Sequence, residues 1–399
     1  MNQIQQEKDW TILIYANGNN ELEPEMRQAM HNAEKVGSNA DVNVVIQLGR
    51  AKYELVKLVR QEIEPKSEGS WSGVRRYFVT KGGSTLVGNL KRVNMADPKN
   101  LYAFIRWGMR FYPANKYMLI LGGHGYQFVG MMTDYSQKAP YIMGIPEMVR
   151  AINKGANGIG KIDSLVLDTC YFNSIEVIYE LGKEENHSVK SAITYIKNGA
   201  IEGLPYDRII EIVQKNSDVE DITAIIQEII DNLSYDLVAY KINHHTLKQI
   251  KQLFNDAASA YLSRNIDDGN KLFKKVSDVL STNDQTVVSN LMSSLVIHFK
   301  SVSQSNSFQG IIANRPATDD LGLILRYYRL GFAQDNCWTC LLSNKHVEVN
   351  MAVEQKKGIF PLKMRPEEVY AYISIMNPGL EKTQIIEMLK ELYQYKNWI

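Results

Sequence analysis

A histidine and a cysteine follow two apolar segments of this 399-residue sequence, at positions where a catalytic pair could form. His124 lies in the run Gly122-Gly123-His124-Gly125, directly after the segment YMLIL, and Cys170 lies two residues after Asp168, which ends the segment SLVLD. Reactive groups of open parallel sheets lie just past the carboxyl ends of strands, so neighbouring strand ends would turn the imidazole and the thiol toward one crevice. A thiol beside an imidazole supports nucleophilic catalysis through a covalent intermediate.

The residues around this pair suit the same chemistry. Cys170 precedes a predicted helix at about Ser174–Leu181, and the positive end of a helix dipole favours the thiolate form of a cysteine. Gly125 has no side chain, so its backbone N–H can approach an oxyanion, with the Cys170 N–H as second donor. We therefore expect an oxyanion hole made by Gly125 and Cys170.

Spacing alone leaves a structural interpretation open. A single cysteine after a strand is usually a small buried hydrophobic residue. A single histidine in a glycine-rich loop is usually structural or solvated. On spacing alone, that interpretation of His124 and Cys170 is the more common one.

Short apolar runs in the first 200 residues predict strands that alternate with helices. These runs are Trp10–Ala16, Asp41–Leu48, Val74–Thr80, Tyr117–Leu121, Ser164–Asp168 and Ser191–Ile196. One helix is expected from Glu21 to about Ala33, and another begins at Asp97-Pro98, because Asp can cap a helix and Pro is tolerated at its first position. Near-continuous apolar strands separated by helices indicate an α/β fold with a mostly parallel sheet sandwiched by helices.

The pattern becomes mainly helical after about residue 207. The later helices are expected at Ile222–Leu233, Thr246–Leu262, Pro366–Ile375 and Glu381–Tyr393, with late strands at Leu295–Lys300 and Phe308–Ala313. We therefore expect a catalytic domain over residues 1–207, a mainly helical region with late strands over 208–345, and a helical extension over 346–399.

The overall composition excludes several classes of protein. The 45 basic and 44 acidic side chains give a net charge of +1, whereas nucleic-acid and membrane-surface binders usually carry a large basic excess. No run of apolar residues is long enough for a transmembrane helix, and Met1–Asp9 contains no apolar core of a signal peptide. The protein is thus expected in the cytoplasm, or secreted or at the cell surface if an export segment precedes this sequence.

Four segments resemble successive blocks of the clostripain family of cysteine peptidases. They are WTILIYANGNNELE, VNMADPKNLYAFIRWGMRFYPANKYMLILGGHG, LDTCYFNSIEVIYEL and YYRLGFAQDNCWTCLL, and the likeness spans roughly residues 10–345. The resemblance implies the caspase-like fold, which caspases, gingipains, legumain and separase share. It also implies an endopeptidase that acts on polypeptides and needs no organic cofactor.

The resemblance also implies roles for single residues. His124 becomes the catalytic histidine, Cys170 the nucleophile, and Asp168 the acidic base of a pocket for a basic P1 side chain. Some relatives depend on calcium, although this sequence contains no recognisable calcium-binding loop.

Relatives also cleave themselves between the histidine and cysteine blocks after a basic residue. Here Lys154 and Lys161 flank a glycine-rich run, 155–160, which we expect to be an exposed loop; Lys138 and Arg150 are the other basic residues of this stretch.

The sequence departs from the family around the expected pocket. Tyr126-Gln127-Phe128 follows the His-Gly pair, where small residues and Trp are common, and Tyr171-Phe172 replaces the usual Leu-Met after the cysteine. Lys197 stands where relatives tend to be acidic. If Lys197 points to solvent, Asp168 should select a basic P1 residue; if it pairs with Asp168, the pocket should prefer an uncharged or acidic one. Because lysine usually extends outward, we expect a basic P1 preference.

Other candidate sites are weaker. Cys337 and Cys340 have CxxC spacing, but no second ligand pair lies nearby, so we expect structural cysteines and predict no metal site. His244-His245 should be a solvated pair at a helix start, and Gly82-Gly83-Ser84 a loop that lacks a phosphate-binding lysine. Asp134, downstream of His124, should structure its loop.

Two further functions remain open. A catalytically silent caspase-like binding or scaffold protein is favoured by the unusual residues around Lys197. A thiol oxidoreductase would use Cys337 and Cys340. The reactivity of Cys170 toward a directed electrophile separates the first from a peptidase, and a redox-dependent mass shift at the cysteine pair identifies the second.

Overall fold

The computed structural model describes residues 6–61, 63, 71–264, 279–302, 321–341 and 361–394. The predicted late strand Phe308–Ala313 lies outside these residues. The other late strand is confirmed as β12, Val296–Lys300.

A nine-stranded sheet with the order β12-β11-β10-β9-β5-β1-β2-β3-β4 forms the centre of the molecule. Its other strands are β1 (Lys8–Gly18), β2 (Val42–Arg50), β3 (Gly73–Thr80), β4 (Gly83–Lys91), β5 (Ala114–Gly122), β9 (Ser164–Asp168), β10 (Ser191–Tyr195) and β11 (Leu237–Lys241). The strands from β10 to β2 in this order pair in parallel, as expected from their continuous apolar runs. Both edges are antiparallel. Lys81 and Gly82 form the turn between β3 and β4, so the predicted loop at 82–84 is wrong for Gly83 and Ser84, which begin β4.

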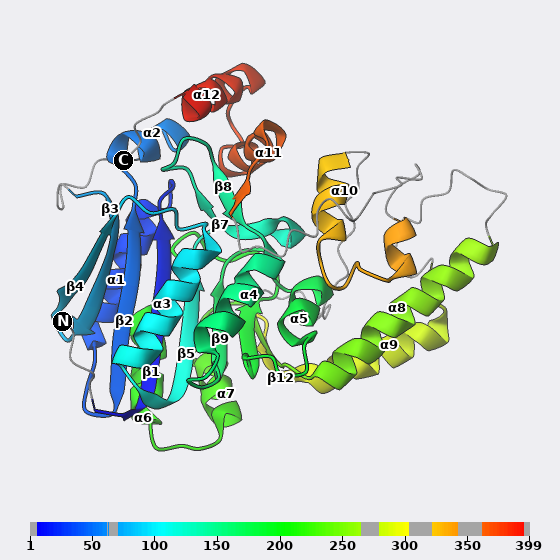
Figure 1. The fold of residues 1–399 in the computed structure, drawn as a ribbon, viewed down its shortest axis with the longest axis horizontal. Helices are drawn as coiled ribbons and strands as arrows, with labels where there is room; N and C mark the ends of the chain where they lie inside the picture. The colour runs from blue at the N-terminus through cyan, green and yellow to red at the C-terminus, as the bar shows by residue number, and fades with distance from the viewer. Residues whose placement is uncertain are drawn as a thin grey trace.

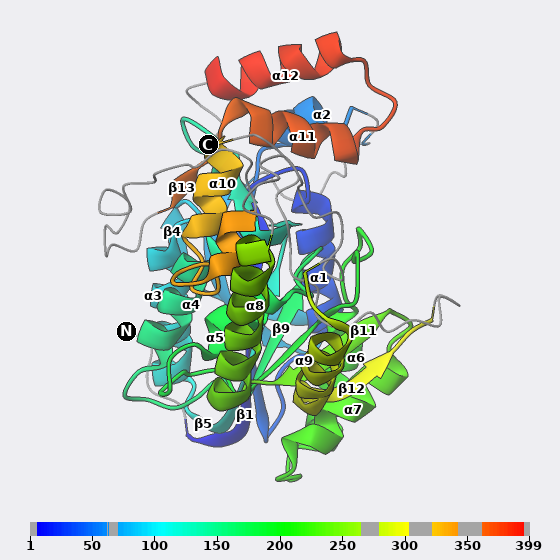
Figure 2. The ribbon, with the colours of Figure 1, turned by 90° about the vertical axis from the view of Figure 1, so that its right-hand side faces the viewer.

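Helices cover both faces of the sheet (Figures 1 and 2). The helices of the described residues are α1 (Glu23–Val36), α2 (Tyr53–Val59), α3 (Pro98–Phe111), α4 (Ile145–Ala156), α5 (Ile175–Gly182), α6 (Tyr206–Lys215), α7 (Ile222–Asn232), α8 (His244–Arg264), α9 (Thr282–Leu295), α10 (Leu321–Tyr328), α11 (Pro366–Met376) and α12 (Lys382–Gln394). Asp97 caps α3 as predicted, because its side chain accepts a hydrogen bond from Lys99 N.

The alternation of side chains along β1 shows how the two faces are buried. Ile12 and Ile14 belong to an apolar cluster with residues of α1, α6 and α7, whereas Leu13 and Tyr15 belong to a cluster with residues of α3, α4 and α5. The predicted α/β sandwich is therefore confirmed. None of the helices in the described parts of the chain is long and apolar enough to cross a bilayer.

A second, four-stranded sheet lies past the carboxyl end of β5, in the order β13-β8-β7-β6. It consists of β6 (Gly125–Tyr126), β7 (Gly130–Asp134), β8 (Tyr141–Met143) and β13 (Leu362–Lys363). Through β13 the C-terminal segment joins this sheet, so that α11 and α12 lie beyond the carboxyl ends of the central strands (Figure 1).

The two sheets cross the expected domain boundaries. Strands β11 and β12, from the region 208–345, extend the main sheet, and β13, from the region 346–399, extends the second sheet. The division of the chain into three folding units stays a prediction.

Candidate active site

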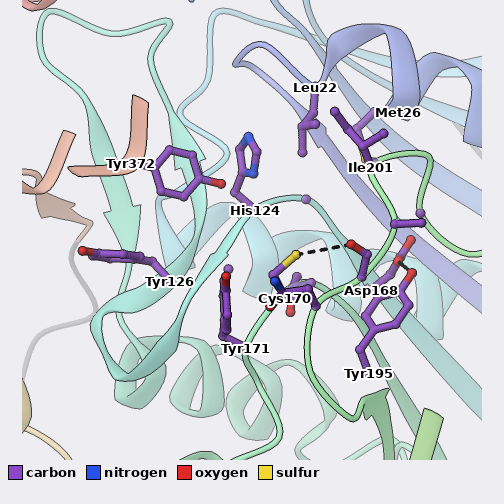
Figure 3. Close-up of a pocket in the computed structure, with 17 residues that line it drawn as sticks. Leu22, Met26, His124, Tyr126, Asp168, Cys170, Tyr171, Tyr195, Ile201 and Tyr372 are labelled. Carbon is purple, nitrogen blue, oxygen red and sulfur yellow. Dashed lines mark hydrogen bonds between the residues drawn. The ribbon is translucent and has the colours of Figure 1, made fainter. Parts of the chain in front are cut away.

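Three parallel strands run in register to the same edge of the sheet and bring the predicted pair together. Ala16 of β1 aligns with Gly122 of β5, and Gly122 aligns with Asp168 of β9. His124 and Cys170 each lie two residues past these aligned ends, and both line one pocket (Figure 3). The crevice expected from the strand pattern is therefore present.

Cys170 lies in a tight turn that the loop after β10 holds in place. Tyr171, the next residue, has a φ of 63°, in the left-handed region that favours glycine. Its N–H donates a hydrogen bond of 3.2 Å to the Lys197 carbonyl oxygen. The Cys170 Sγ donates to the Gly199 carbonyl oxygen at 3.9 Å. Two contacts with one loop thus stabilise a backbone geometry that turns the thiol into the pocket.

The environment of Cys170 favours the thiol and not the thiolate. Burial raises the pKa of the Cys170 thiol, and the nearby negative charge of Asp168 raises it further. The helix expected after Cys170 is present as α5, Ile175–Gly182, and the Ser174 side chain caps it by accepting from Val177 N, but burial outweighs any help from its dipole and the pKa of the thiol is raised.

His124 is paired with a carboxylate that sequence reasoning missed. Its Nε2 lies 2.8 Å from Oε1 of Glu21, and the side chains of the two residues are 7% and 0% exposed. A carboxylate bonded to one ring nitrogen fixes the orientation of the ring and decides which nitrogen faces the pocket. Glu21 was expected to begin a helix, but α1 begins at Glu23, which leaves Glu21 in the turn after β1. The available signal was that β1 is a third strand ending at this edge.

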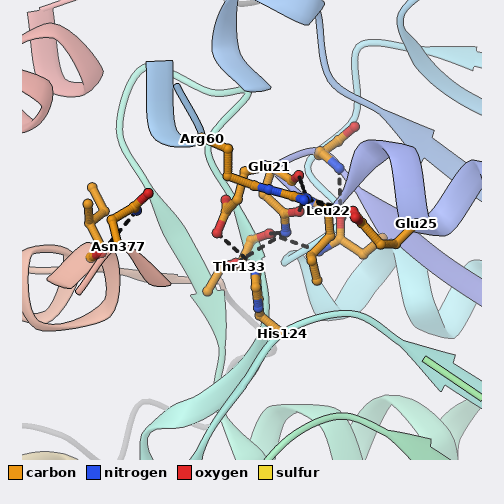
Figure 4. Close-up of polar contacts among 11 residues, drawn as sticks. Glu21, Leu22, Glu25, Arg60, His124, Thr133 and Asn377 are labelled. Atoms are coloured by element: carbon orange, nitrogen blue, oxygen red, sulfur yellow. Dashed lines mark hydrogen bonds and ion pairs between the residues drawn. The ribbon is translucent and has the colours of Figure 1, made fainter. Parts of the chain in front are cut away.

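A polar network holds the turn that carries Glu21 (Figure 4). Arg60 Nη1 donates to the Glu21 carbonyl oxygen at 3.1 Å and to both carboxylate oxygens of Glu25 at 2.9 Å. Asn20 Nδ2 donates to the Thr133 carbonyl oxygen at 2.7 Å, which ties the turn to β7. The Glu21 Oε2 is buried and has no hydrogen-bond partner among the described residues, so the carboxylate acts on His124 through its other oxygen.

Gly125 lies against the backbone of Cys170. A Cβ at position 125 would come within 2.4 Å of the Cys170 carbonyl oxygen, so any other residue would push the two segments apart. Glycine therefore permits the close approach that an oxyanion hole needs, although the roles of the Gly125 and Cys170 amides stay a prediction.

The pocket has two halves on either side of Cys170 and a volume of about 270 Å³ (Figure 3). One half is formed by Asp168 and Tyr195 with the apolar residues Leu22, Met26 and Ile201. The other half contains the aromatic rings of Tyr126, Tyr171 and Tyr372.

Tyr372 reaches the site from helix α11, in the C-terminal segment. Its ring centroid lies 4.6 Å from that of the His124 imidazole, at an interplanar angle of 79°. It was not predicted, because no local pattern in the sequence connects α11 to the histidine. Together with Glu21, it encloses the imidazole.

Comparison with known proteins decides what this site belongs to. The model of the clostripain family matches residues 14–326, which is most of the chain. The chain belongs to the clostripain family of cysteine peptidases. No curated protein matches the sequence.

Solved structures agree with the fold of this clostripain-family peptidase. A secreted C11 cysteine protease from Bacteroides thetaiotaomicron, iotapain, is 14% identical with a TM-score of 0.57, covering 82% of this chain and 99% of that chain. An inactive zymogen C11 protease from Parabacteroides distasonis is 17% identical with a TM-score of 0.56, covering 84% and 99%. A secreted C11 protease from B. thetaiotaomicron in complex with an irreversible peptide inhibitor is 14% identical with a TM-score of 0.56, covering 85% and 100%.

In this clostripain-family peptidase, Asp168 lies in the pocket, but its carboxylate is already hydrogen-bonded. Oδ1 accepts from the Tyr195 hydroxyl at 2.7 Å, and Oδ2 accepts from the Tyr206 hydroxyl at 2.9 Å. The Leu204 N–H adds contacts of 3.2 and 3.1 Å to the two oxygens. Burial raises the pKa of Asp168 despite these donors. Lys197 is exposed, as expected, and the donors to the Asp168 carboxylate in the described residues are Tyr195, Leu204 and Tyr206.

Several other predictions concern residues outside the pocket. Asp134 is confirmed as a loop-structuring residue, since it is fully buried and accepts from Ser136 N and Oγ, Asn19 Nδ2 and Met95 N. Burial raises the pKa of Asp134 to about 6. The predicted solvated pair is wrong for His244, whose Nδ1 lies 2.8 Å from the Gly182 carbonyl oxygen, whereas His245 is exposed.

Two further expectations concern the cysteine pair and the loop expected at 155–160. Cys337 and Cys340 lie in the 3₁₀ helix Cys337–Leu341 as free thiols. Lys154 lies within α4, which continues to Ala156, so the expected exposed loop at 155–160 is wrong for its first two residues. No cluster of three or more His, Cys, Asp or Glu side chains suited to a metal ion occurs in the described ranges of the chain.

Proposed function

We propose that this chain is a cysteine endopeptidase in which Cys170 is the nucleophile and His124 its acid/base partner. The observation that carries the proposal is the alignment of three strand ends, which places the thiol and the Glu21-paired imidazole on one pocket. Such a pair performs peptide hydrolysis through a thioacyl-enzyme.

The reaction proceeds in two steps. The Cys170 thiol loses its proton to His124 and its sulfur attacks the scissile carbonyl carbon, the C–N bond breaks, and His124 passes a proton to the leaving amine. Water then attacks the thioester, the C–S bond breaks, and the acid product leaves with the thiol restored. The backbone N–H groups of Gly125 and Cys170 donate to the oxyanion of each tetrahedral intermediate.

His124 is best placed to protonate the leaving amine. The recorded hydrogen bond of the Cys170 Sγ goes to the Gly199 carbonyl oxygen and not to the imidazole, which argues against a preformed ion pair. Glu21 holds the ring through Nε2, so the other ring nitrogen is left to act on substrate. Glu21 is a positioning residue in this scheme because it works through His124.

The substrate is a polypeptide. The basic P1 preference expected from the family resemblance depends on Asp168 being able to bind a cation, and the mechanism itself does not depend on it. Two of the compared structures are described as secreted proteases, and we extend the same location to this chain. The calcium dependence implied by the family resemblance would appear as loss of activity with a calcium chelator and recovery on adding calcium.

The test compares the native protein with Cys170→Ala on fluorogenic peptides that vary at P1. We expect turnover with at least one P1 residue in the native protein and none in the variant. Comparable turnover in both proteins would contradict the assignment of Cys170.

Electrophile labelling separates a peptidase from a catalytically silent protein. A peptide with a thiol-reactive group at its scissile position should modify Cys170 far faster than Cys340, an exposed free thiol of the same chain. Equal rates at the two cysteines would favour the silent binding protein.

A further inference from the structure

The apolar half of the pocket ends at a carboxylate that is already occupied. Each oxygen of Asp168 accepts from a tyrosine hydroxyl and from the Leu204 N–H, so four contacts use the acceptor positions of the carboxylate. We propose that this pocket selects an uncharged aliphatic P1 side chain, of the size of Leu or Met. Tyr195 and Tyr206 set this specificity because their hydroxyls occupy the hydrogen-bond acceptor positions of Asp168. The inference rests on the proposed function, since it concerns the substrate of the same site.

The loop after β10 also screens Asp168 sterically. Gly203 has a φ of 72°, and a Cβ there would come within 2.7 Å of the Asp168 Oδ2. The backbone of this loop therefore covers the carboxylate, which is 5% exposed. A guanidinium or ammonium group could reach both oxygens only by displacing the loop or the two hydroxyls.

The tyrosine hydroxyls remain donors under all ordinary conditions. Burial and the negative charge of Asp168 raise the pKa of both Tyr195 and Tyr206. Each hydroxyl thus keeps its proton and continues to donate to Asp168.

No second carboxylate replaces Asp168 for a cationic substrate. Asp168 is the one acidic residue among the described residues that line the pocket. Glu202 is next to Ile201 in the loop, but its side chain is exposed and does not line the pocket. Placing a cation in a pocket without a free counter-charge carries a large desolvation cost.

The remaining walls favour an aliphatic side chain. Leu22 and Met26, at the start of α1, and Ile201, in the loop after β10, face the space beside Cys170 (Figure 3). Each buried CH₂ group contributes roughly 0.8 kcal/mol. A Leu or Met side chain can use this surface fully, whereas an Arg or Lys side chain would carry its charge into it.

The first experiment measures kcat/KM for matched fluorogenic peptides with Leu, Met, Gln, Arg, Lys or Asp at P1. We expect the Leu and Met peptides to exceed the Arg and Lys peptides by at least about tenfold, the lower end of what a charged hydrogen bond contributes. Arg or Lys as the best P1 residue would overturn the inference while leaving the proposed function intact. If no peptide is cleaved in a Cys170-dependent way, the proposed function fails, and the inference with it.

The second experiment frees the carboxylate. In the double variant Tyr195→Phe/Tyr206→Phe the rings stay but both hydroxyl donors are lost, so the Arg-to-Leu ratio of kcat/KM should rise by about 10- to 150-fold. Tyr235→Phe is the matched control, because Tyr235 touches the Tyr195 ring at 6.1 Å between centroids without a recorded hydrogen bond to Asp168. Glu202→Gln should likewise leave the ratio unchanged.

A fold check accompanies these variants. If the double variant is unfolded by circular dichroism, the single variant Tyr195→Phe replaces it, with an expected rise in the same ratio of at least about threefold, a part of the double-variant effect. An unchanged ratio in a folded variant would overturn the role of the tyrosines.

Discussion

Replacing Glu21 by Gln should slow catalysis while leaving substrate binding nearly unchanged. The side chain is fully buried, and its Oε1 accepts a 2.8 Å hydrogen bond from His124. Gln keeps the size and an acceptor but loses the charge that orients and stabilises a protonated imidazole. A hydrogen bond to a charged group contributes roughly 1.5–3 kcal/mol, which corresponds to a loss in kcat of about 10- to 150-fold. KM should change little, because Glu21 does not line the pocket.

The assay is steady-state kinetics on the best peptide, with the melting temperature recorded for each variant. Glu21→Asp should recover part of the lost kcat, because it restores the charge at a slightly greater distance. Glu34→Gln is a matched control: Glu34 forms another His–Glu contact on α1, 3.0 Å from His31, and neither residue lines the pocket. A folded Glu21→Gln enzyme with kcat within threefold of the native value would refute the reasoning, and so would a loss confined to stability.

Four further predictions follow from other contacts. His124→Ala should lower kcat by roughly 10²–10⁴-fold, and a loss below tenfold in steady-state assays would point to a different acid/base. Because burial raises the pKa of Cys170, its iodoacetamide alkylation rate should reach half-maximum at a higher pH than that of free cysteine, as the thiolate is the reactive form; a lower midpoint by mass spectrometry would be inconsistent. Asp134→Ala should lower the free energy of unfolding by at least about 2 kcal/mol in denaturant titrations, because four buried donor contacts lose their acceptor, and a smaller effect would mean that water replaces the carboxylate. Prolonged incubation should leave the chain intact, because an uncharged P1 preference removes cleavage after Lys138 and Lys161. These are the exposed lysines that lie outside α4 in the stretch between His124 and Cys170, and Cys170-dependent cleavage at either, seen by mass spectrometry, would contradict this.

Much of the fold could be predicted because its signals are local. The apolar runs that become β1, β5 and β9 are visible in the sequence, and a strand pattern with intervening helices implies a covered sheet. The antiparallel edges were less visible. Strand β11 is short, and no turn signal in the sequence marks where it begins. Strand β4 is partly exposed, so the residues of β4 lack the apolar continuity of the central strands.

The sequence by itself determined which residues could react, and only the tertiary structure decided what surrounds them. His124 and Cys170 follow directly from the ends of two recognisable strands, since strand ends in a parallel sheet meet at one edge. Glu21 contacts His124 across 103 residues, and Tyr195 and Tyr206 contact Asp168 across 27 and 38 residues. These contacts depend on register and on the course of the loop after β10, which arise from packing between distant segments. The local sequence pattern was therefore enough to identify the nucleophile. It could not show how His124 is oriented or whether the Asp168 carboxylate is free to bind a charged substrate.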